Sequence, residues 1–272
     1  MAPTLPLAHP PGARVTPTSQ CEKSRLTKII NRGVECCGSA SCRRAPGSAG
    51  ETVTERIALF PLGTVLFPGL VLPLHLFEER YRRLVADLME TPEPRGFGVV
   101  NIELGHEVGN DAARRLSGVG CFAELHDVTR HADGRYDIVA VGTRRFRLKE
   151  QDRSRPYLRG EVEYLPEEPG PDPVPAARHV RWLFGRYLER LRTAGAGPAE
   201  EIDLPADPVR LSYLIASSLI TDGHEKQRLL ECEDAALRLR AERDLLRREN
   251  RILGALPTLP AGQFLDGSFH PN

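Results

Sequence analysis

Three polar residues lie close together at the end of a long apolar stretch. His75 stands between Leu74 and Leu76, and Glu78 and Arg80 follow it. A lone histidine between leucines indicates a hydrogen-bonded core residue more than a general base. Glu78 and Arg80 either form an ion pair that orients the fold or border a binding groove, and both interpretations stay open.

A second group with chemical potential is the basic segment of residues 144–155. Its six cations are Arg144, Arg145, Arg147, Lys149, Arg153 and Arg155. Phosphates favour clustered arginine, so RNA contact is one interpretation, and a solvated strand edge is the other. Glu150 and Asp152 interrupt the segment and the chain balances 37 basic against 37 acidic residues, so we favour the strand edge and expect no nucleic-acid partner.

Sequence motifs for catalysis are weak. The chain lacks a G-x-x-x-x-G-K-[ST] phosphate loop and an H-E-x-x-H metal motif. Ser48 sits in P-G-S-A-G without a fixed base or oxyanion site, which a nucleophilic serine requires. The candidate substrate-binding residues are therefore His75, Glu78, Arg80 and Arg145, and we expect no catalytic residue, no cofactor and no enzyme activity.

The cysteines indicate reduced thiols and no metal site. Cys36, Cys37 and Cys42, with Cys21, do not have a regular zinc-ligand spacing. Two further cysteines, at positions 121 and 232, lie in apolar settings typical of a core. No charged start followed by an apolar run precedes them, so we expect a cytoplasmic protein.

The apolar stretch itself spans Ile57 to Phe77 without a formal charge, which is long enough to cross a bilayer. Pro61, Pro68 and Pro73 would break a helix at each of these points. We therefore predict interior strands at residues 57–60 and 71–76 and no membrane span. An amphipathic helix is expected from Glu78 to the prolines after Thr91, with a stripe made by Tyr81, Leu84, Val85, Leu88 and Met89.

This region carries a family resemblance. F-P-L-G-x-V-L-F-P-G-x-x-L-P-L-H-L-F-E-x-R-Y, at residues 60–81, resembles the opening of the Lon N-terminal domain, the substrate-binding domain of ATP-dependent Lon proteases. G-x-x-R-F-R at 142–147 and K-Q-x-L-L-E at 226–231 extend the similarity over roughly residues 55–253. Glu79 departs from the family's usual proline.

The resemblance implies a fold and a role. The fold would be a PUA-like β pseudobarrel, and the role a non-catalytic module that recognises unfolded or degron-bearing polypeptides. The expected partner is an ATP-dependent protease, with this chain as an adaptor or as a chaperone-like holder in protein quality control. Polypeptide would bind in a groove between two domains or along an exposed strand edge.

The predicted organisation is α+β, with a β domain and one helix (55–166) followed by a helical bundle (176–254). Further strands are expected at 96–102, 118–129, 136–141, 143–150 and 157–165, with a polar loop at 105–117 and a hairpin turn at 131–134. Residues 167–175 are a proline-rich linker, and 1–54 and 255–272 are disordered tails, the first being either a true tail or the product of an early start codon.

The bundle is predicted from four amphipathic segments. Residues 176–192 form the first, Asp207 and Asp222 cap the next two, and residues 234–253 form the last, with Leu237, Ala241, Leu245 and Ile252 as its face. Leu239, Leu246 and Leu253 recur every seven residues, which permits a dimeric coiled coil, but we favour an intramolecular bundle.

Overall fold

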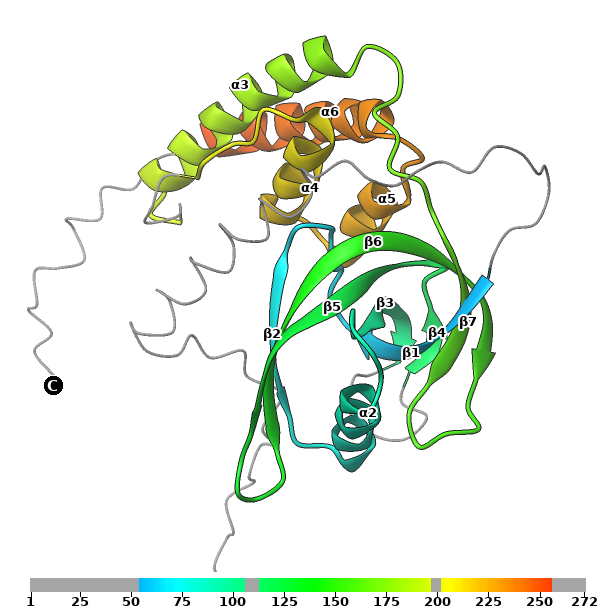
Figure 1. Ribbon diagram of the computed structural model, residues 1–272. Helices are drawn as coiled ribbons and strands as arrows, with labels where there is room; N and C mark the ends of the chain where they lie inside the picture. Colours follow the sequence, from blue (N-terminus) through cyan, green and yellow to red (C-terminus); the bar gives the residue numbers. More distant parts are fainter. Residues whose placement is uncertain (1–53, 106–112, 197–201, 256–272) are drawn as a thin grey trace, which may run out of the picture.

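The computed structural model describes residues 54–105, 113–196 and 202–255, which form a largely antiparallel sheet and five helices (Figure 1). The strands are β1 (Thr54–Leu62), β2 (Val71–Leu76), β3 (Gly96–Gly105), β4 (Ala113–Leu116), β5 (Val119–Arg130), β6 (Tyr136–Asp152) and β7 (Arg159–Tyr164). The helices are α2 (Glu79–Met89), α3 (Pro173–Thr193), α4 (Pro208–Ser218), α5 (Gly223–Glu231) and α6 (Ala235–Ala255). Apart from Thr54 and Ala255, both predicted tails lie outside the described residues.

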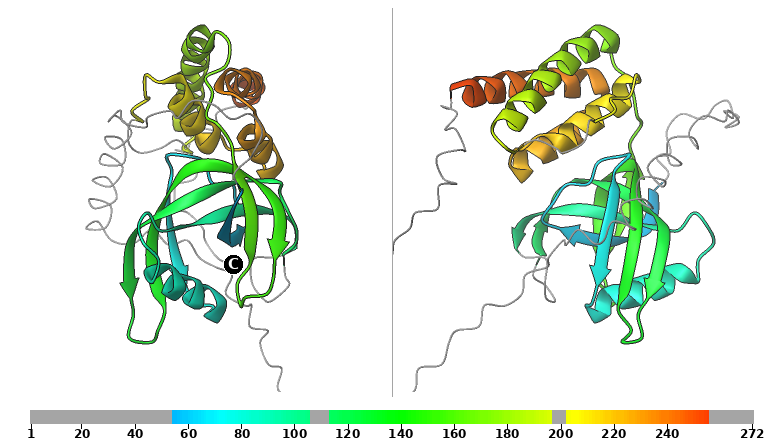
Figure 2. Two further views of the ribbon diagram at one scale, coloured as in Figure 1. Left: turned by 45° about the vertical axis from the view of Figure 1, so that its right-hand side comes forward. Right: turned by 90° about the vertical axis from the view of Figure 1, so that its left-hand side faces the viewer.

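Helices α3 to α6 gather at one end of the sheet, and α2 lies at the other end (Figures 1 and 2). The strand order is β1-β7-β6-β5-β3-β4, and β1 also pairs with β3 in parallel. Five strands are therefore each hydrogen-bonded to the next around a ring. β2 pairs with β6 alone, so that β2, β6 and the end of β5 extend as an arm from this ring.

The proline-punctuated stretch forms two strands, as predicted, and not a single helix. β1 is buried from Leu59 to Leu62, but β2 is an edge strand whose outward residues Pro73 and His75 are exposed. The expectation of an interior position was wrong for β2, because only one face of that strand is covered. No helix in the described part of the chain combines the length and apolarity needed to cross a membrane.

β6 is one long strand where two were predicted on either side of Gly142. The predicted bend survives as a register irregularity opposite Phe122 and Ala123. A Cβ at Gly142 would lie 2.5 Å from the carbonyl oxygen of Phe67, so glycine is needed for this close approach. The irregularity lets β6 pair with β2 before it and with β7 after it.

Two further expectations were wrong in their boundaries. The predicted loop at 105–117 contains β4, a short charged strand paired with β3 and joined to it by an Arg115–Glu103 ion pair of 2.5 Å. Helix α3 begins at Pro173, inside the predicted linker. The rest of that linker is held against α6, because the carbonyl oxygens of Glu168 and Pro169 accept hydrogen bonds from the backbone of α6.

The helices bury the predicted faces with one exception. Asp207 and Asp222 cap α4 and α5 as expected, because each carboxylate accepts a hydrogen bond from the backbone N–H three residues later. In α6 the buried face centres on Leu239 and Leu246, which pack within the same chain. Leu237 and Ile252, predicted to lie on the buried face of this helix, are exposed.

Candidate functional site

Arg145, a predicted binding residue, lies at the junction between the sheet and the helices and is 1 % exposed. Its guanidinium pairs with Glu167 at 3.0 Å and donates to the carbonyl oxygens of Leu230 at 2.9 Å, Pro166 at 3.1 Å and Cys232. The prediction of a solvated strand edge was wrong here, because the end of α5 and the turn after it cover this position. Its donors are occupied within the protein, so it has little surface left for a ligand.

A second buried arginine continues the same network. Arg238 donates to Ser212 Oγ at 2.9 Å and to the hydroxyl of Tyr213 at 3.1 Å, and its guanidinium lies 3.9 Å from the Tyr213 ring centre. The Tyr213 hydroxyl in turn contacts Glu167, the ion-pair partner of Arg145. Burial raises the pKa of Tyr213 above its ordinary value, so the phenol stays a neutral donor.

The junction is also packed with apolar side chains, which bears on the expected groove. Val65, Phe67 and Val119 of the β part belong to one buried cluster with residues of α3 to α6. The side-chain amide of Gln227, from α5, donates to the carbonyl oxygen of Val119 at 2.9 Å. Where these residues meet, the sheet and the helices are in direct contact.

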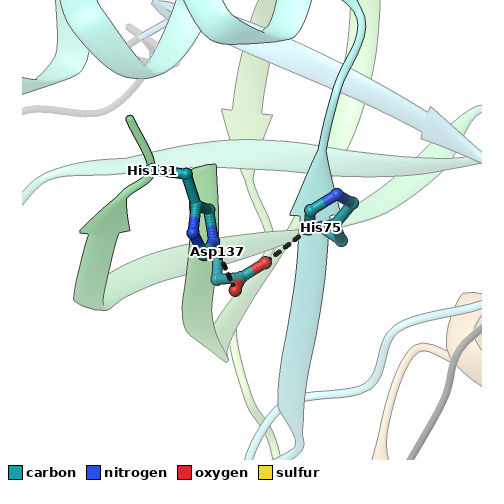
Figure 3. Close-up of side chains that lie close together, drawn as sticks. All are labelled: His75, His131 and Asp137. Carbon is teal, nitrogen blue, oxygen red and sulfur yellow. Dashed lines mark hydrogen bonds and ion pairs between the residues drawn. The ribbon is translucent and has the colours of Figure 1, made fainter. Parts of the chain in front are cut away.

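His75 lies on the outward face of the arm and is 44 % exposed, so the prediction of a core position was wrong. Its hydrogen-bonded state was anticipated correctly: Nδ1 lies 2.5 Å from Asp137 Oδ1. His131 Nε2 lies 2.7 Å from the other oxygen of Asp137, so one carboxylate joins two imidazoles (Figure 3). Burial alone would raise the pKa of Asp137, but the hydrogen bonds with His75 and His131 lower it.

Sequence reasoning missed Asp137 and His131 as neighbours of His75. Both lie at the hairpin that was predicted correctly at 131–134, but only the pairing of β2 with β6 sets His75 directly opposite Asp137. The sequence therefore showed His131 and Asp137 as polar residues at or near a turn, but not as neighbours of His75. The register that brings them to His75 is a long-range property.

Glu78 and Arg80 form an ion pair at 3.0 Å, and each side chain is 18 % exposed. The Arg80 guanidinium also lies 4.4 Å from the ring centre of Tyr81. The ion pair that was one of the two interpretations of Glu78 and Arg80 is therefore present, at the start of α2. The binding role assigned to His75, Glu78, Arg80 and Arg145 stays a prediction.

Three cations of the basic segment lie against aromatic or acidic side chains. Arg144 lies 3.9 Å from the ring centre of Tyr164, and Lys149 pairs with Glu163 at 2.5 Å. Arg155 lies 3.8 Å from a carboxylate oxygen of Asp87. Phe146 is fully buried, as expected. These three cations thus have separate aromatic or acidic partners.

A concave site lies elsewhere, between α3 and α6, where a cavity of about 250 Å³ opens. Pro175, Ala176, Val180 and Leu239 contribute its apolar lining, and His179, Arg240, Arg243 and Arg247 its polar lining. Trp182, which is 56 % exposed, follows on α3, with its ring centre 6.3 Å from that of His179. Sequence reasoning assigned these helices to a bundle and did not single out the site, although a tryptophan among arginines was visible in the sequence.

Residues 56–248 match the family model of the ATP-dependent protease La (LON) substrate-binding domain, and the chain belongs to that family. Lon protease 2 of Syntrophobacter fumaroxidans is 29 % identical over 185 residues, which is 66 % of this chain and 23 % of that protein. Lon protease 2 of Myxococcus xanthus is 27 % identical over 207 residues, covering 75 % of this chain and 25 % of that protein.

One solved structure has the same fold, and a second is similar to it. The N-terminal domain of Mycobacterium avium complex Lon protease superposes with a TM-score of 0.50 at 19 % identity, over 71 % of this chain and 98 % of that one. A Lon N-terminal domain protein from Xanthomonas campestris has a TM-score of 0.46 at 24 % identity, over 75 % and 99 % of the two chains. The chain spans about a quarter of the length of the curated Lon proteases it matches.

Proposed function

We propose that this protein is a non-catalytic module that recognises polypeptides. The observation that carries the proposal is the family match, because residues 56–248 include both the sheet and the helices α3 to α5 and most of α6. Membership in a substrate-binding family supports recognition of unfolded or degron-bearing chains. The buried Arg145 network supports it further, since it joins the sheet and the helices into one preorganised unit.

Within this unit, we place the recognition surface at the α3–α6 cavity together with Trp182, which we call the α3–α6 groove. Ala176, Val180 and Leu239 offer an apolar floor, and a cavity of about 250 Å³ has room for one or two side chains of a ligand. Trp182 extends the surface with the type of aromatic side chain that is enriched at binding hot spots.

The positive charge of the arginines around the groove indicates the charge of the ligand that it would bind. Arg240, Arg243 and Arg247 line it from α6, and Arg186 lies 5.0 Å from the ring centre of Trp182. The chain as a whole has a formal net charge of zero, so this concentration of arginine is local. Charge complementarity therefore favours a short polypeptide segment in which acidic residues flank an apolar side chain.

The proposed module acts with other proteins. It would hold a client or deliver it to an ATP-dependent protease, in the cytoplasm, as an adaptor or a chaperone-like holder. We also propose that the five-strand ring is a PUA-like pseudobarrel, which is supported by the β1–β3 pairing that links the first and the fifth strand of the sheet path. An RNA-binding role has no support in the family match or in the distributed partners of residues 144–155.

The groove can be tested with the intrinsic fluorescence of Trp182, which is the single tryptophan of the chain. Peptides with acidic residues around an apolar centre are titrated into the full chain, and Arg240→Glu is expected to weaken their binding at least about tenfold. Arg147→Glu, an exposed charge reversal on β6, is the matched control and should bind as the wild type does. Equal affinities in both variants would place recognition elsewhere, and no binding of unfolded clients at tens of micromolar would contradict the function itself.

A further inference from the structure

The cluster of His75, His131 and Asp137 has a donor set that the proposed function does not use. Each residue offers a ligand atom, and the three atoms lie within 4.8 Å of one another. Two imidazoles and a carboxylate are a combination that binds Zn²⁺ and related divalent ions in proteins, with a further position left to water. The two imidazole ring centres lie 6.1 Å apart on either side of the carboxylate (Figure 3).

The backbone holds the three residues in place. His75 and Asp137 are directly paired across β2 and β6. His131 opens the hairpin turn, where its N–H donates to the carbonyl oxygen of Arg135 at 2.9 Å and its own carbonyl oxygen accepts from Gly134 at 3.0 Å. Gly134 has a φ of 82°, which a tight turn of this kind requires. The ligand atoms are thus set on a rigid scaffold.

The side chains have the freedom to close around an ion. Two ligand atoms at about 2.0–2.1 Å from a tetrahedral zinc ion lie about 3.4 Å apart, so the largest separation has to shrink by up to about 1.4 Å and the two hydrogen-bonded contacts have to open. His75 and His131 are 44 % and 39 % exposed, so each imidazole has solvent on one side and can rotate by this amount.

The positive charge of Arg135 disfavours a metal ion beside His75, and a neighbouring carboxylate partly neutralises that charge. Arg135 Nη1 lies 3.3 Å from Nε2 of His75, and its charge is offset by Asp133 at 2.6 Å. When His75 binds a metal through Nδ1, Nε2 carries the proton, so the exposed Arg135 side chain has to turn away. Asp137 supplies the negative charge inside the cluster, where each of its oxygens already faces one imidazole.

We propose that His75, His131 and Asp137 form a binding site for a divalent transition-metal ion of the zinc class. The ion joins the edge strand β2 to the β5–β6 hairpin and leaves a coordination position open to solvent. The site lies on the arm, which points away from α3 and α6 (Figures 1 and 2), so it is separate from the α3–α6 groove.

Calorimetric titration of Zn²⁺ into the full chain tests this site. His75→Ala and His131→Ala are each expected to weaken one equivalent of binding by more than about tenfold, since even changes around a metal ligand cost about 10–100-fold in affinity. His126→Ala, an exposed histidine on β5, is the matched control and should retain wild-type affinity. All three positions are at the surface, and circular dichroism of the metal-free variants checks that they fold.

A Co²⁺ titration separates this site from cysteine ligands, which the chain also contains. The proposed site gives d–d absorption without a thiolate-to-cobalt charge-transfer band, and that d–d absorption disappears in His75→Ala. Retention of wild-type Zn²⁺ affinity in both histidine variants would overturn the proposal. So would a titration in which every bound Co²⁺ shows thiolate charge transfer.

Discussion

Two arginines on the same strand show how position decides the role of a residue. Arg145 and Arg147 lie on one face of β6, and Phe146 between them lies on the other face. Arg147 is exposed, whereas Arg145 is buried under the turn between α5 and α6. Arg145 donates hydrogen bonds to carbonyl oxygens at the end of α5 and in that turn. A guanidinium suits this position because its several donors are fixed in one plane.

Replacement of Arg145 by alanine is expected to destabilise the protein by about 3 kcal/mol, because buried carbonyl oxygens and Glu167 lose their partner. Arg147→Ala provides the control and should change stability by less than about 0.5 kcal/mol. Urea unfolding of both variants measures the difference. A loss of under about 1 kcal/mol for Arg145→Ala would mean that water replaces the lost donors.

At the scale of elements, β2 illustrates how an edge strand is positioned and protected. It pairs with β6 alone, and Pro73 offers no backbone donor to an incoming strand. Recognition by strand addition was one of the two modes expected from the sequence. Pro73 makes this edge a poor template for it, which is one reason to place polypeptide recognition at the α3–α6 groove.

Helix α5 is tied to α6 by an ion pair that gives a pH dependence. Arg248 donates two hydrogen bonds to Glu225, at 2.8 and 2.9 Å, and these, followed by the hydrogen bond from Thr221, lower the pKa of Glu225 to about 2. Because the folded pKa is depressed, the stabilisation is fully present above the unfolded pKa of about 4.3 and is lost as the pH falls towards 2.

Glu225→Gln is therefore expected to cost up to about 1 kcal/mol at pH 7, and the difference from the wild type should shrink between about pH 4 and pH 2. Denaturant unfolding at several pH values measures this. Glu189→Gln, at an exposed residue of α3, is the comparison, because its partner Arg192 lies at 3.6 Å in a solvated pair. A constant cost for Glu225→Gln at every pH would contradict the assigned ion pair.

For the whole molecule, the three recognised motifs prove to meet in space. Phe67 of the first motif, Arg145 of the second and Gln227 of the third all lie at the junction of the sheet and the helices. One residue from each motif thus helps to hold the two parts together. The binding surface that we propose lies on other residues, between α3 and α6.

This shared junction predicts that the sheet and the helices unfold together. Trp182 fluorescence reports on the helices, and amide hydrogen exchange along β5 reports on the sheet; both should give one transition with the same midpoint. Phe67→Ala is expected to cost about 3–5 kcal/mol and to shift both probes equally. Leu104→Ala, at an exposed side chain, should leave both midpoints unchanged. Two separate transitions would show independent parts.

By itself, the sequence determined the features that depend on neighbours in the chain. Three prolines excluded a helix over residues 57–77, Asp207 and Asp222 marked helix starts, and the hydrophobic spacing of α3 identified its buried face. The long motif at residues 60–81 also identified the family that the comparisons establish. These signals are local, so they can be seen without coordinates.

Only the tertiary structure decided which polar residues are buried, exposed or brought together. His75 was expected inside and lies on an edge strand, whereas Arg145 was expected outside and lies under α5 and α6. The His75–Asp137–His131 cluster depends on strand register, and the α3–α6 groove depends on how two helices pack. Burial and proximity of this kind are set by segments far apart in the chain, because a side chain's surroundings come mostly from elements that its own sequence window does not contain.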